Sequence, residues 1–285
     1  MSKIRLIECP RDAMQGYSKF IETEKKINYI NNLLEVGFYA IDCGSFVSEK
    51  MIPQMHDTPY VIKSLIKEES KTKIIVIVAN ERGALDASNY DQINIFGYPF
   101  SISENFQIRN TNKTIKESIN VLNNIIEISD KSNKEVVVYL SMAFGNPYGD
   151  PWNIEIVLDW IYRLKILGIK TISLSDTIGI SKPDQIKRIL NAANSEYKEI
   201  EFGAHFHSMP SDWYDKIKSA YSSGCYRFDG TIMGYGGCPM ASNNLIGNIP
   251  TEKLINFFKN KENNIKLNIV DFENAIDNFK ALIKL

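Results

Sequence analysis

The sequence predicts a TIM (β/α)8 barrel that forms a single domain over residues 1–285, with an additional helix at its C-terminal end. From residue 3 onward, short apolar runs alternate with longer amphipathic segments, as in repeated βα units that build a parallel sheet. Eight such units follow one another without a linker, a low-complexity run or an internal repeat. Eight βα units are the number that closes a barrel, and barrels of this length commonly form one domain.

The predicted strands are mostly continuous apolar runs rather than alternating ones. Residues 74–78, for example, read Ile-Ile-Val-Ile-Val. Strands of this composition are typical of a parallel sheet that is covered on both faces. The eight expected strands are Ile4–Glu8, Tyr39–Asp42, Lys73–Val78, Gln92–Phe96, Glu135–Ser141, Thr171–Ser175, Glu201–His205 and Tyr226–Ile232.

Helices are expected between these strands. Apolar residues at positions 154, 157, 158, 161 and 164 form one stripe with helical spacing, and Gly168 follows where a helix would end. Ser181 is expected to cap the next helix, with Asp184 three positions further on. The segment Val270–Leu285 is expected to form the additional helix.

Composition and charge favour a soluble globular enzyme. The chain is 44% apolar and 24% charged, and its 33 basic and 34 acidic residues give a net charge of −1. No overall field would therefore attract nucleic acid or an anionic membrane. We find neither a secretory signal nor the roughly 18 apolar residues that a membrane span needs, so we expect the cytoplasm. Four cysteines without CxxC spacing indicate neither structural zinc nor a disulfide framework.

Charged side chains follow several of the predicted strands. Arg11 and Asp12 come after the first strand, Asp42 ends the second and Asp176 follows the sixth. A barrel gathers these strand ends at one mouth, where barrel enzymes carry their chemistry. Each residue also has a structural interpretation, namely a surface ion pair for Arg11 and Asp12, a cap for Asp42 and a buried hydrogen-bonding role for Asp176.

Two of the three histidines lie two residues apart in the seventh predicted strand. His205 and His207 therefore project from one face while Phe206 points the other way, so the two imidazoles can share a metal. A solvated or hydrogen-bonded pair is the alternative. Together with Asp12 and Asn248, the two histidines form a mixed set of oxygen and nitrogen ligands that suits Mg²⁺ or Mn²⁺ better than a closed zinc site. Asn248 could instead serve at a helix entry.

A glycine-rich loop, residues 234–241, follows the eighth predicted strand and presents Cys238. Such a loop can cradle phosphate, or it can act as a mobile lid that delivers the cysteine to the site. By itself, the pattern would indicate only a loop.

Motifs along nearly the whole chain resemble those of the 3-hydroxy-3-methylglutaryl-CoA (HMG-CoA) lyase family, within the superfamily of metal-dependent lyases and Claisen-condensing barrels. The Arg-Asp-x-x-Gln and His-x-His pieces are shared across the superfamily, whereas Ser-Phe-Val-Ser and Gly-Gly-Cys-Pro are more particular to the lyase. The matching pieces are Pro10-Arg11-Asp12-x-x-Gln15, Ser45-Phe46-Val47-Ser48-x-Lys50-x-x-Pro53-Gln54-Met55, Ser173-Leu174-x-Asp176-Thr177-Ile178-Gly179, His205-x-His207, Gly234-x-Gly236-Gly237-Cys238-Pro239-x-Ala241 and Gly247-Asn248.

The resemblance implies cleavage of HMG-CoA to acetyl-CoA and acetoacetate with a divalent metal, Mg²⁺ or Mn²⁺. It implies Asp12, His205, His207 and Asn248 as metal ligands. Catalytic roles follow for Arg11, which would stabilise the enolate, for His205 as the base, for Cys238 as proton donor or gate, and for Asp12 and Asp42. Substrate contacts are expected from Gln15, Asp176, Gly236 and Gly237.

The chain departs from the family pattern at several positions. Asp42 and Ile7 stand where the family usually has glutamate, Ala13 replaces a glycine, and Ser208-Met209-Pro210 replaces an acidic, glycine-containing turn. Two other hypotheses therefore stay open, a related acyl-CoA condensing transferase or aldolase and a catalytically silent barrel that binds acyl-CoA. An acyl-CoA thioester is the expected partner, whereas the exact acyl group, the metal, the CoA contacts and a homodimer are left open.

Overall fold

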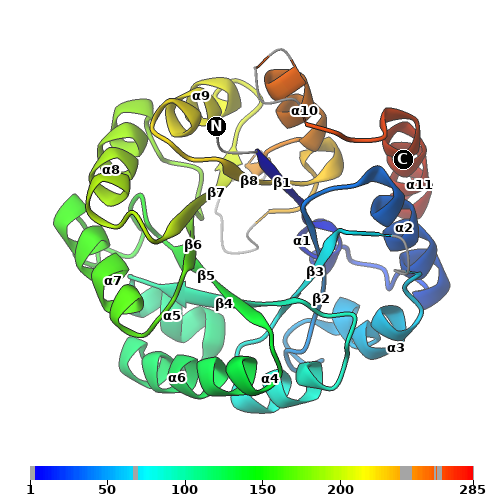
Figure 1. The fold of residues 1–285 in the computed structure, drawn as a ribbon, viewed down its shortest axis with the longest axis horizontal. Helices are drawn as coiled ribbons and strands as arrows, with labels where there is room; N and C mark the ends of the chain where they lie inside the picture. Colours follow the sequence, from blue (N-terminus) through cyan, green and yellow to red (C-terminus); the bar gives the residue numbers. More distant parts are fainter. Residues whose placement is uncertain (1–3, 67–69, 238–245, 260, 262–264, 285) are drawn as a thin grey trace.

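Eight parallel strands close into a barrel surrounded by helices, which confirms the predicted fold (Figure 1). The computed structural model describes residues 4–66, 70–237, 246–259, 261 and 265–284. Around the barrel the order is β6-β5-β4-β3-β2-β1-β8-β7, and pairing of β6 with β7 closes it. The strands are β1 (Arg5–Glu8), β2 (Ala40–Ser45), β3 (Lys73–Ile77), β4 (Ile95–Ser101), β5 (Glu135–Ser141), β6 (Thr171–Asp176), β7 (Glu201–Ser208) and β8 (Arg227–Gly230).

The strand boundaries differ most from the prediction at β4, and the ends of β2, β7 and β8 differ by two or three residues. β4 begins three residues later than predicted and continues to Ser101, because it stays in parallel register with β5 from Ile95 through Pro99 to its end. β8 ends at Gly230, because the backbone N–H of Thr231 donates to Ile249 and the chain then enters η2 (Ile232–Gly234). β9 (Gly247–Asn248), which pairs antiparallel with the end of β7, was not predicted.

Most of the helices surround the barrel of strands. They are α1 (Pro10–Gln15), α2 (Thr23–Val36), α3 (Thr58–Lys63), α4 (Glu81–Ser88), α5 (Glu104–Thr111), α6 (Ile115–Lys131), α7 (Ile154–Ile166), α8 (Pro183–Glu196), α9 (Trp213–Ser222), α10 (Thr251–Lys259) and α11 (Ile269–Ile283), with a short η1 at Pro53–Met55. No helix in the described ranges is long and apolar enough to cross a membrane.

Two predictions about helix ends can be compared with the structure. Gly168 follows α7 with a φ of 89°, as expected for the residue after a helix end. The prediction that Ser181 caps α8 is wrong, since Lys182 occupies the N-cap position. The Ser181 hydroxyl instead donates to Asp176 at 2.6 Å, because that carboxylate lies directly beneath the turn.

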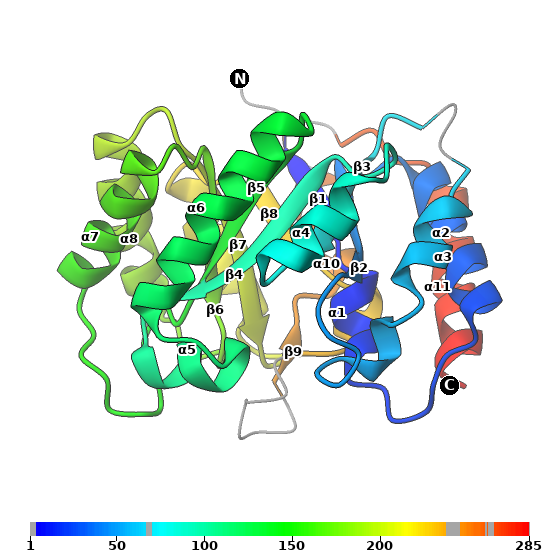
Figure 2. The same ribbon diagram turned by 90° about the horizontal axis from the view of Figure 1, so that it is seen from below.

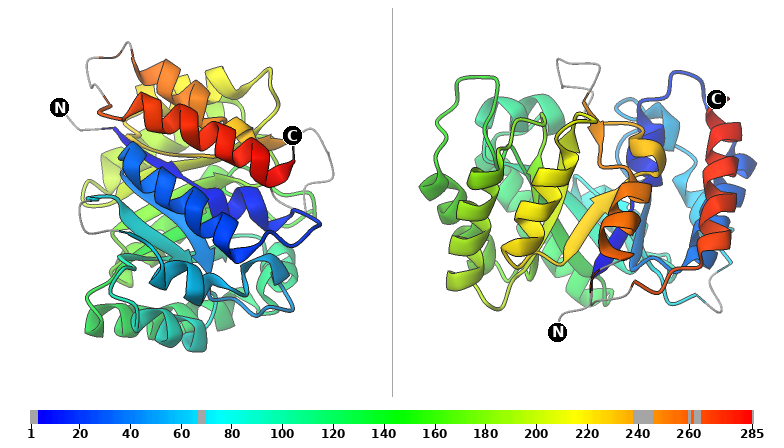
Figure 3. Two further views of the ribbon diagram at one scale, coloured as in Figure 1. Left: turned by 90° about the vertical axis from the view of Figure 1, so that its right-hand side faces the viewer. Right: turned by 90° about the horizontal axis from the view of Figure 1, so that it is seen from above.

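The additional C-terminal helix, α11, packs beside α2 on the outside of the barrel (Figure 3, left). Its predicted range agrees with the observed one to within two residues at each end. The strands all end on the side of the barrel on which α1, α5 and β9 lie (Figure 2). This side is the barrel mouth.

Apolar side chains form two layers. The larger one lies between the strands and the surrounding helices, and a smaller one fills the barrel interior. Ile7 belongs to the inner layer, whereas its neighbour Glu8 points outward and accepts hydrogen bonds from the Ile232 N–H at 2.8 Å and the Thr251 hydroxyl at 2.5 Å. The inner side of β1 therefore carries an apolar residue where the family pattern has a glutamate.

Candidate active site

The predicted site residues gather around a cavity of about 270 Å³ at the barrel mouth. Its lining includes Arg11, Asp12 and Gln15 from α1 and His205 and His207 from β7. A larger hollow of about 740 Å³ lies near the amino ends of the strands, beside Ile4, Leu6 and other residues. Because barrel enzymes place their chemistry at the carboxyl ends of the strands, we take the smaller cavity as the site.

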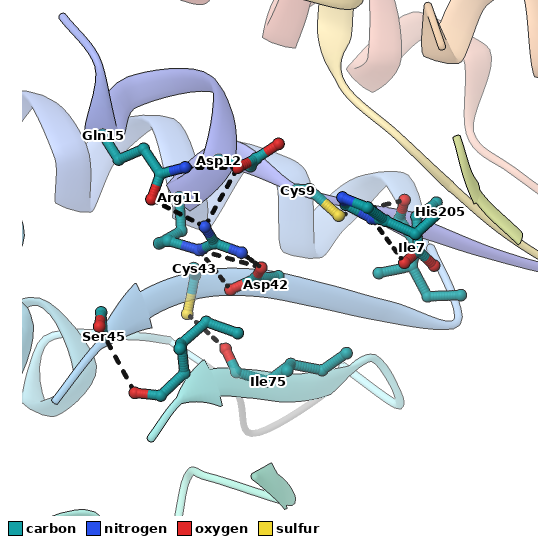
Figure 4. A network of polar contacts seen from close by, with 12 residues as sticks. Ile7, Cys9, Arg11, Asp12, Gln15, Asp42, Cys43, Ser45, Ile75 and His205 are labelled. Carbon is teal, nitrogen blue, oxygen red and sulfur yellow. Dashed lines mark hydrogen bonds and ion pairs between the residues drawn. The ribbon is translucent and has the colours of Figure 1, made fainter. Parts of the chain in front are cut away.

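The first turn of α1 orients Arg11. Pro10 opens this helix, and the guanidinium lies between two carboxylates (Figure 4). Its Nη2 is 2.5 Å from Asp42 Oδ2 and its Nε is 3.1 Å from the same oxygen, while Nη1 is 3.1 Å from Asp12 Oδ1 and 2.9 Å from Gln15 Oε1. Arg11 is therefore held on two sides and still lines the cavity.

Asp42 lies behind Arg11 rather than in the cavity lining. It is fully buried, and both of its carboxylate oxygens accept hydrogen bonds from Arg11. Burial raises the pKa of Asp42, although Arg11 opposes the rise. Its contacts show that it anchors the guanidinium of Arg11. A catalytic role for Asp42 stays a prediction, and such a role would act through Arg11.

The two histidines have the arrangement that the strand pattern predicted. Their ring centroids are 5.5 Å apart, and Phe206 points to the opposite face, where it packs against Phe144. His205 Nδ1 lies 3.0 Å from Asp229 Oδ2. Burial lowers the pKa of His205, but Asp229 outweighs this effect and leaves it above its usual value. Burial and the neighbouring His205 lower the pKa of His207 to about 4, so that its imidazole is neutral.

These residues fit a hard divalent cation. Asp12, His205 and His207 each offer a ligand atom, and the three atoms lie within 4.8 Å of one another. His207 Nδ1 is buried without a hydrogen-bond partner, as expected for a nitrogen that coordinates a metal ion. Burial raises the pKa of Asp12, but Arg11 and the histidines outweigh it, so that the carboxylate stays ionised.

Asn248 reaches the same place from β9. The backbone of Asn248 pairs with that of His207 in the short antiparallel ladder. The side-chain amide nitrogen of Asn248 donates to Asp12 Oδ2 at 2.8 Å. Ligation by the amide oxygen needs the opposite orientation of this amide. One carboxylate, two imidazoles and one amide form a mixed set that suits Mg²⁺ or Mn²⁺.

The glycines after η2 pack closely against the backbone of α1 and of the segment before β9. Gly236 has a φ of 85°, and a Cβ there would lie 2.5 Å from the carbonyl oxygen of Asp12. Gly237 has a φ of 135°, and a Cβ there would lie 2.9 Å from the carbonyl oxygen of Ile246. Both the backbone angles and the close approach require glycine. Their substrate contacts stay predictions, and Cys238 lies outside the described residues.

Asp176 is buried beside the site and does not line the cavity. It accepts hydrogen bonds from the backbone of Ile180 and Ser181, from the Ser181 hydroxyl and from Lys216. These contacts agree with the hydrogen-bonding interpretation, so a substrate contact by Asp176 stays an untested prediction.

Sequence reasoning missed two residues next to the histidines, Asp229 and Lys216. Asp229 lies within the predicted eighth strand, where alternation could have placed it on the inner face. Lys216 had no such signal, because a lysine in an amphipathic helix usually lies in solvent.

The chain is similar to known proteins over nearly its whole length. The HMGL-like family model matches residues 4–278. Hydroxymethylglutaryl-CoA lyase YngG of Bacillus subtilis is 34% identical over 91% of this chain and 85% of its own length. The cytoplasmic 3-hydroxy-3-methylglutaryl-CoA lyase of Homo sapiens is 31% identical over 88% of this chain and 68% of its own length.

A solved structure extends the likeness to three dimensions. It is that of an HMG-CoA lyase from Acinetobacter baumannii in complex with coenzyme A and 3-methylmalate, which has a TM-score of 0.90 and 28% identity and covers 99% of this chain and 92% of the other. Fold and site together define a barrel of the metal-dependent lyase class. The chain belongs to the HMGL-like family, and the predicted family resemblance is confirmed.

Proposed function

We propose that the protein is a divalent-metal-dependent lyase that cleaves HMG-CoA to acetyl-CoA and acetoacetate. The observation that carries this proposal is the meeting of Arg11 with Asp12, His205 and His207 around one cavity. The relatives named above support the substrate, since two are named for this activity and the third is described with coenzyme A. Cytoplasmic location and a homodimer stay predictions.

A base takes the proton of the tertiary hydroxyl, and the bond between C2 and C3 breaks. The hydroxyl-bearing carbon becomes the ketone of acetoacetate, the bonding electrons pass to C2 and the thioester, and protonation of C2 yields acetyl-CoA. A cation held by Asp12, His205, His207 and Asn248 would supply Lewis-acid charge beside the hydroxyl and carboxylate oxygens of the substrate.

Arg11 is suited to stabilise the thioester enolate. Its guanidinium is fixed by Asp42 and Asp12 before substrate arrives, so it needs no reorganisation during the reaction. A preorganised donor aimed at developing negative charge contributes more to the transition state than to the ground state. Gln15 supports this arrangement by accepting from Arg11 at 2.9 Å and donating to Asp12 at 2.6 Å.

His205 has two predicted roles, metal ligand and base. A single ring nitrogen cannot bind the cation and accept the substrate proton in the same step. Since Nδ1 faces Asp229, Nε2 is the nitrogen that is free to serve the cavity. A histidine whose other nitrogen donates to a carboxylate is the common arrangement of a metal ligand, because the carboxylate fixes the tautomer and raises ligand basicity. We therefore assign His205 to the cation.

The acyl group would lie against the apolar side of the cavity. Val47, Ile52, Ile77 and Phe106 line this side. The cavity thus combines the proposed polar ligands with apolar lining residues. A condensing transferase on the same barrel is the second candidate, because it would use the same cation and the same arginine with a different acceptor.

The direct test incubates purified protein with Mg²⁺ or Mn²⁺ and a panel of 3-hydroxyacyl-CoA thioesters and measures acetyl-CoA release. We expect release from HMG-CoA that a chelator abolishes and that added Mg²⁺ restores. Condensation of acetyl-CoA with an oxo acid, without cleavage of any thioester in the panel, would favour the transferase. Inertness toward both substrate classes would favour the silent barrel.

A further inference from the structure

A buried lysine connects the ends of two strands at the site. Lys216 of α9 is 2% exposed, and its Nζ donates to Asp176 Oδ2 at 2.9 Å, to the carbonyl oxygen of Gly179 at 2.9 Å and to the carbonyl oxygen of His207 at 3.0 Å. We propose that Lys216 is a positioning residue that fixes the backbone of His207 so that its imidazole meets the cation. The inference rests on the proposed metal site.

His207 depends on its backbone for its position. The His205 ring is held by Asp229, whereas His207 Nδ1 is buried without a hydrogen-bond partner. The direction of the His207 ring therefore depends on where β7 ends, on the Gly247 backbone beside it and on the packing around it. The bond from Lys216 to the His207 carbonyl acts at this strand end.

The turn after β6 carries the other end of this connection. Gly179 has a φ of 68°, and a Cβ there would lie 3.3 Å from the carbonyl oxygen of His207, so the turn packs closely against β7. Asp176 fixes the same turn by accepting from the N–H groups of Ile180 at 2.9 Å and Ser181 at 3.1 Å. Lys216 thus joins an already ordered turn to the ligand-bearing strand.

The chemistry of these acceptors suits a lysine. An ammonium group offers three donors, which match one carboxylate oxygen and two carbonyl oxygens. The side-chain amide of a glutamine at this position would offer only two donors. Asp212 Oδ2, one helical turn before Lys216, lies 3.3 Å from the same ammonium. Burial of the charge is offset by this pairing, since an unpaired buried lysine would be costly.

The chain contains a matched control in Lys26. This lysine of α2 is also buried, and its Nζ donates to both oxygens of Asp57 and to the carbonyl oxygen of Gln54. Neither Lys26 nor these partners line the cavity. Lys26→Met therefore removes an equivalent buried ion pair without touching His207.

The experiment measures Mn²⁺ affinity by electron paramagnetic resonance, without substrate, together with the melting temperature of each variant. Loss of a partner that orients a metal ligand typically costs about 10- to 100-fold in metal affinity. We expect that loss for Lys216→Met, a smaller loss for Lys216→Gln, which keeps two donors, and wild-type affinity for Lys26→Met. The double variant Lys216→Met/Asp176→Asn removes both charges and should fold while still binding Mn²⁺ weakly.

The outcomes separate this inference from the proposed function. Failure of the wild-type protein to bind Mn²⁺ would defeat the metal site and the inference with it. Binding by the wild type that is unchanged in the folded Lys216 variants would overturn only the positioning role. Equal losses in the Lys216 and Lys26 variants, or failure of every Lys216 variant to fold, would assign the lysine to general stability and overturn the inference as well.

Discussion

Arg11→Met should damage stability and catalysis by different routes. Asp42 is fully buried, and Arg11 donates every side-chain hydrogen bond observed at its carboxylate. Removing one partner of a buried ion pair costs about 3–5 kcal/mol, because the other charge is left unpaired. At roughly 2–4 °C per kcal/mol for a domain of this size class, the melting temperature should fall by about 6–20 °C.

A second substitution separates the two effects. Arg11→Met/Asp42→Asn removes the orphaned carboxylate, so we expect it to regain most of the lost melting temperature. Turnover should not return, because the guanidinium that faces the enolate is absent in both variants. Loss of one donor of this kind costs about 100- to 1,000-fold in kcat.

The measurements are thermal unfolding and acetyl-CoA release on the same protein preparations. The reasoning about Asp42 is refuted if the single variant melts with the wild type. The assignment of Arg11 to the enolate is refuted if the stabilised double variant turns over HMG-CoA at a near-normal rate.

Two further predictions concern a buried acid and a histidine. Burial raises the pKa of Glu8 from 4.5 to about 8, so that the folded protein holds a proton that the unfolded chain releases. Wild-type stability should therefore fall as pH rises between these values, and denaturant titrations of Glu8→Gln should show this slope removed; an unchanged slope would contradict the raised pKa. His205→Gln should lose both turnover and tight Mn²⁺ binding, and retention of wild-type Mn²⁺ affinity with loss of turnover would reassign His205 from ligand to base.

Local periodicity explains which features of the site could be predicted. His205 and His207 lie on the same face because side chains alternate along a strand with a period of two residues, which tertiary packing does not change. The closeness of Asp12 to these histidines follows from the topology, since parallel strands in a barrel end at one mouth. These two rules were enough to predict that three of the four proposed ligands, Asp12, His205 and His207, lie close together.

The missed features depend on contacts between distant residues. Nothing near Asp42 in the sequence indicates that Arg11 occupies both of its oxygens. The burial of Lys216 depends on acceptors from β6 and β7 that only the fold assembles. β9 was missed because two residues carry too little pattern to indicate a strand, although it brings Asn248 beside His207.

The stoichiometry of the reaction with pure HMG-CoA and Mg²⁺ decides whether the protein is a metal-dependent HMG-CoA lyase. We predict that the wild-type protein forms acetyl-CoA and acetoacetate in equal amounts as HMG-CoA disappears, and that neither product forms after the metal is removed with a chelator. Disappearance of HMG-CoA without acetoacetate, or equal product formation in the metal-free protein, would rule out metal-dependent cleavage of HMG-CoA to these two products.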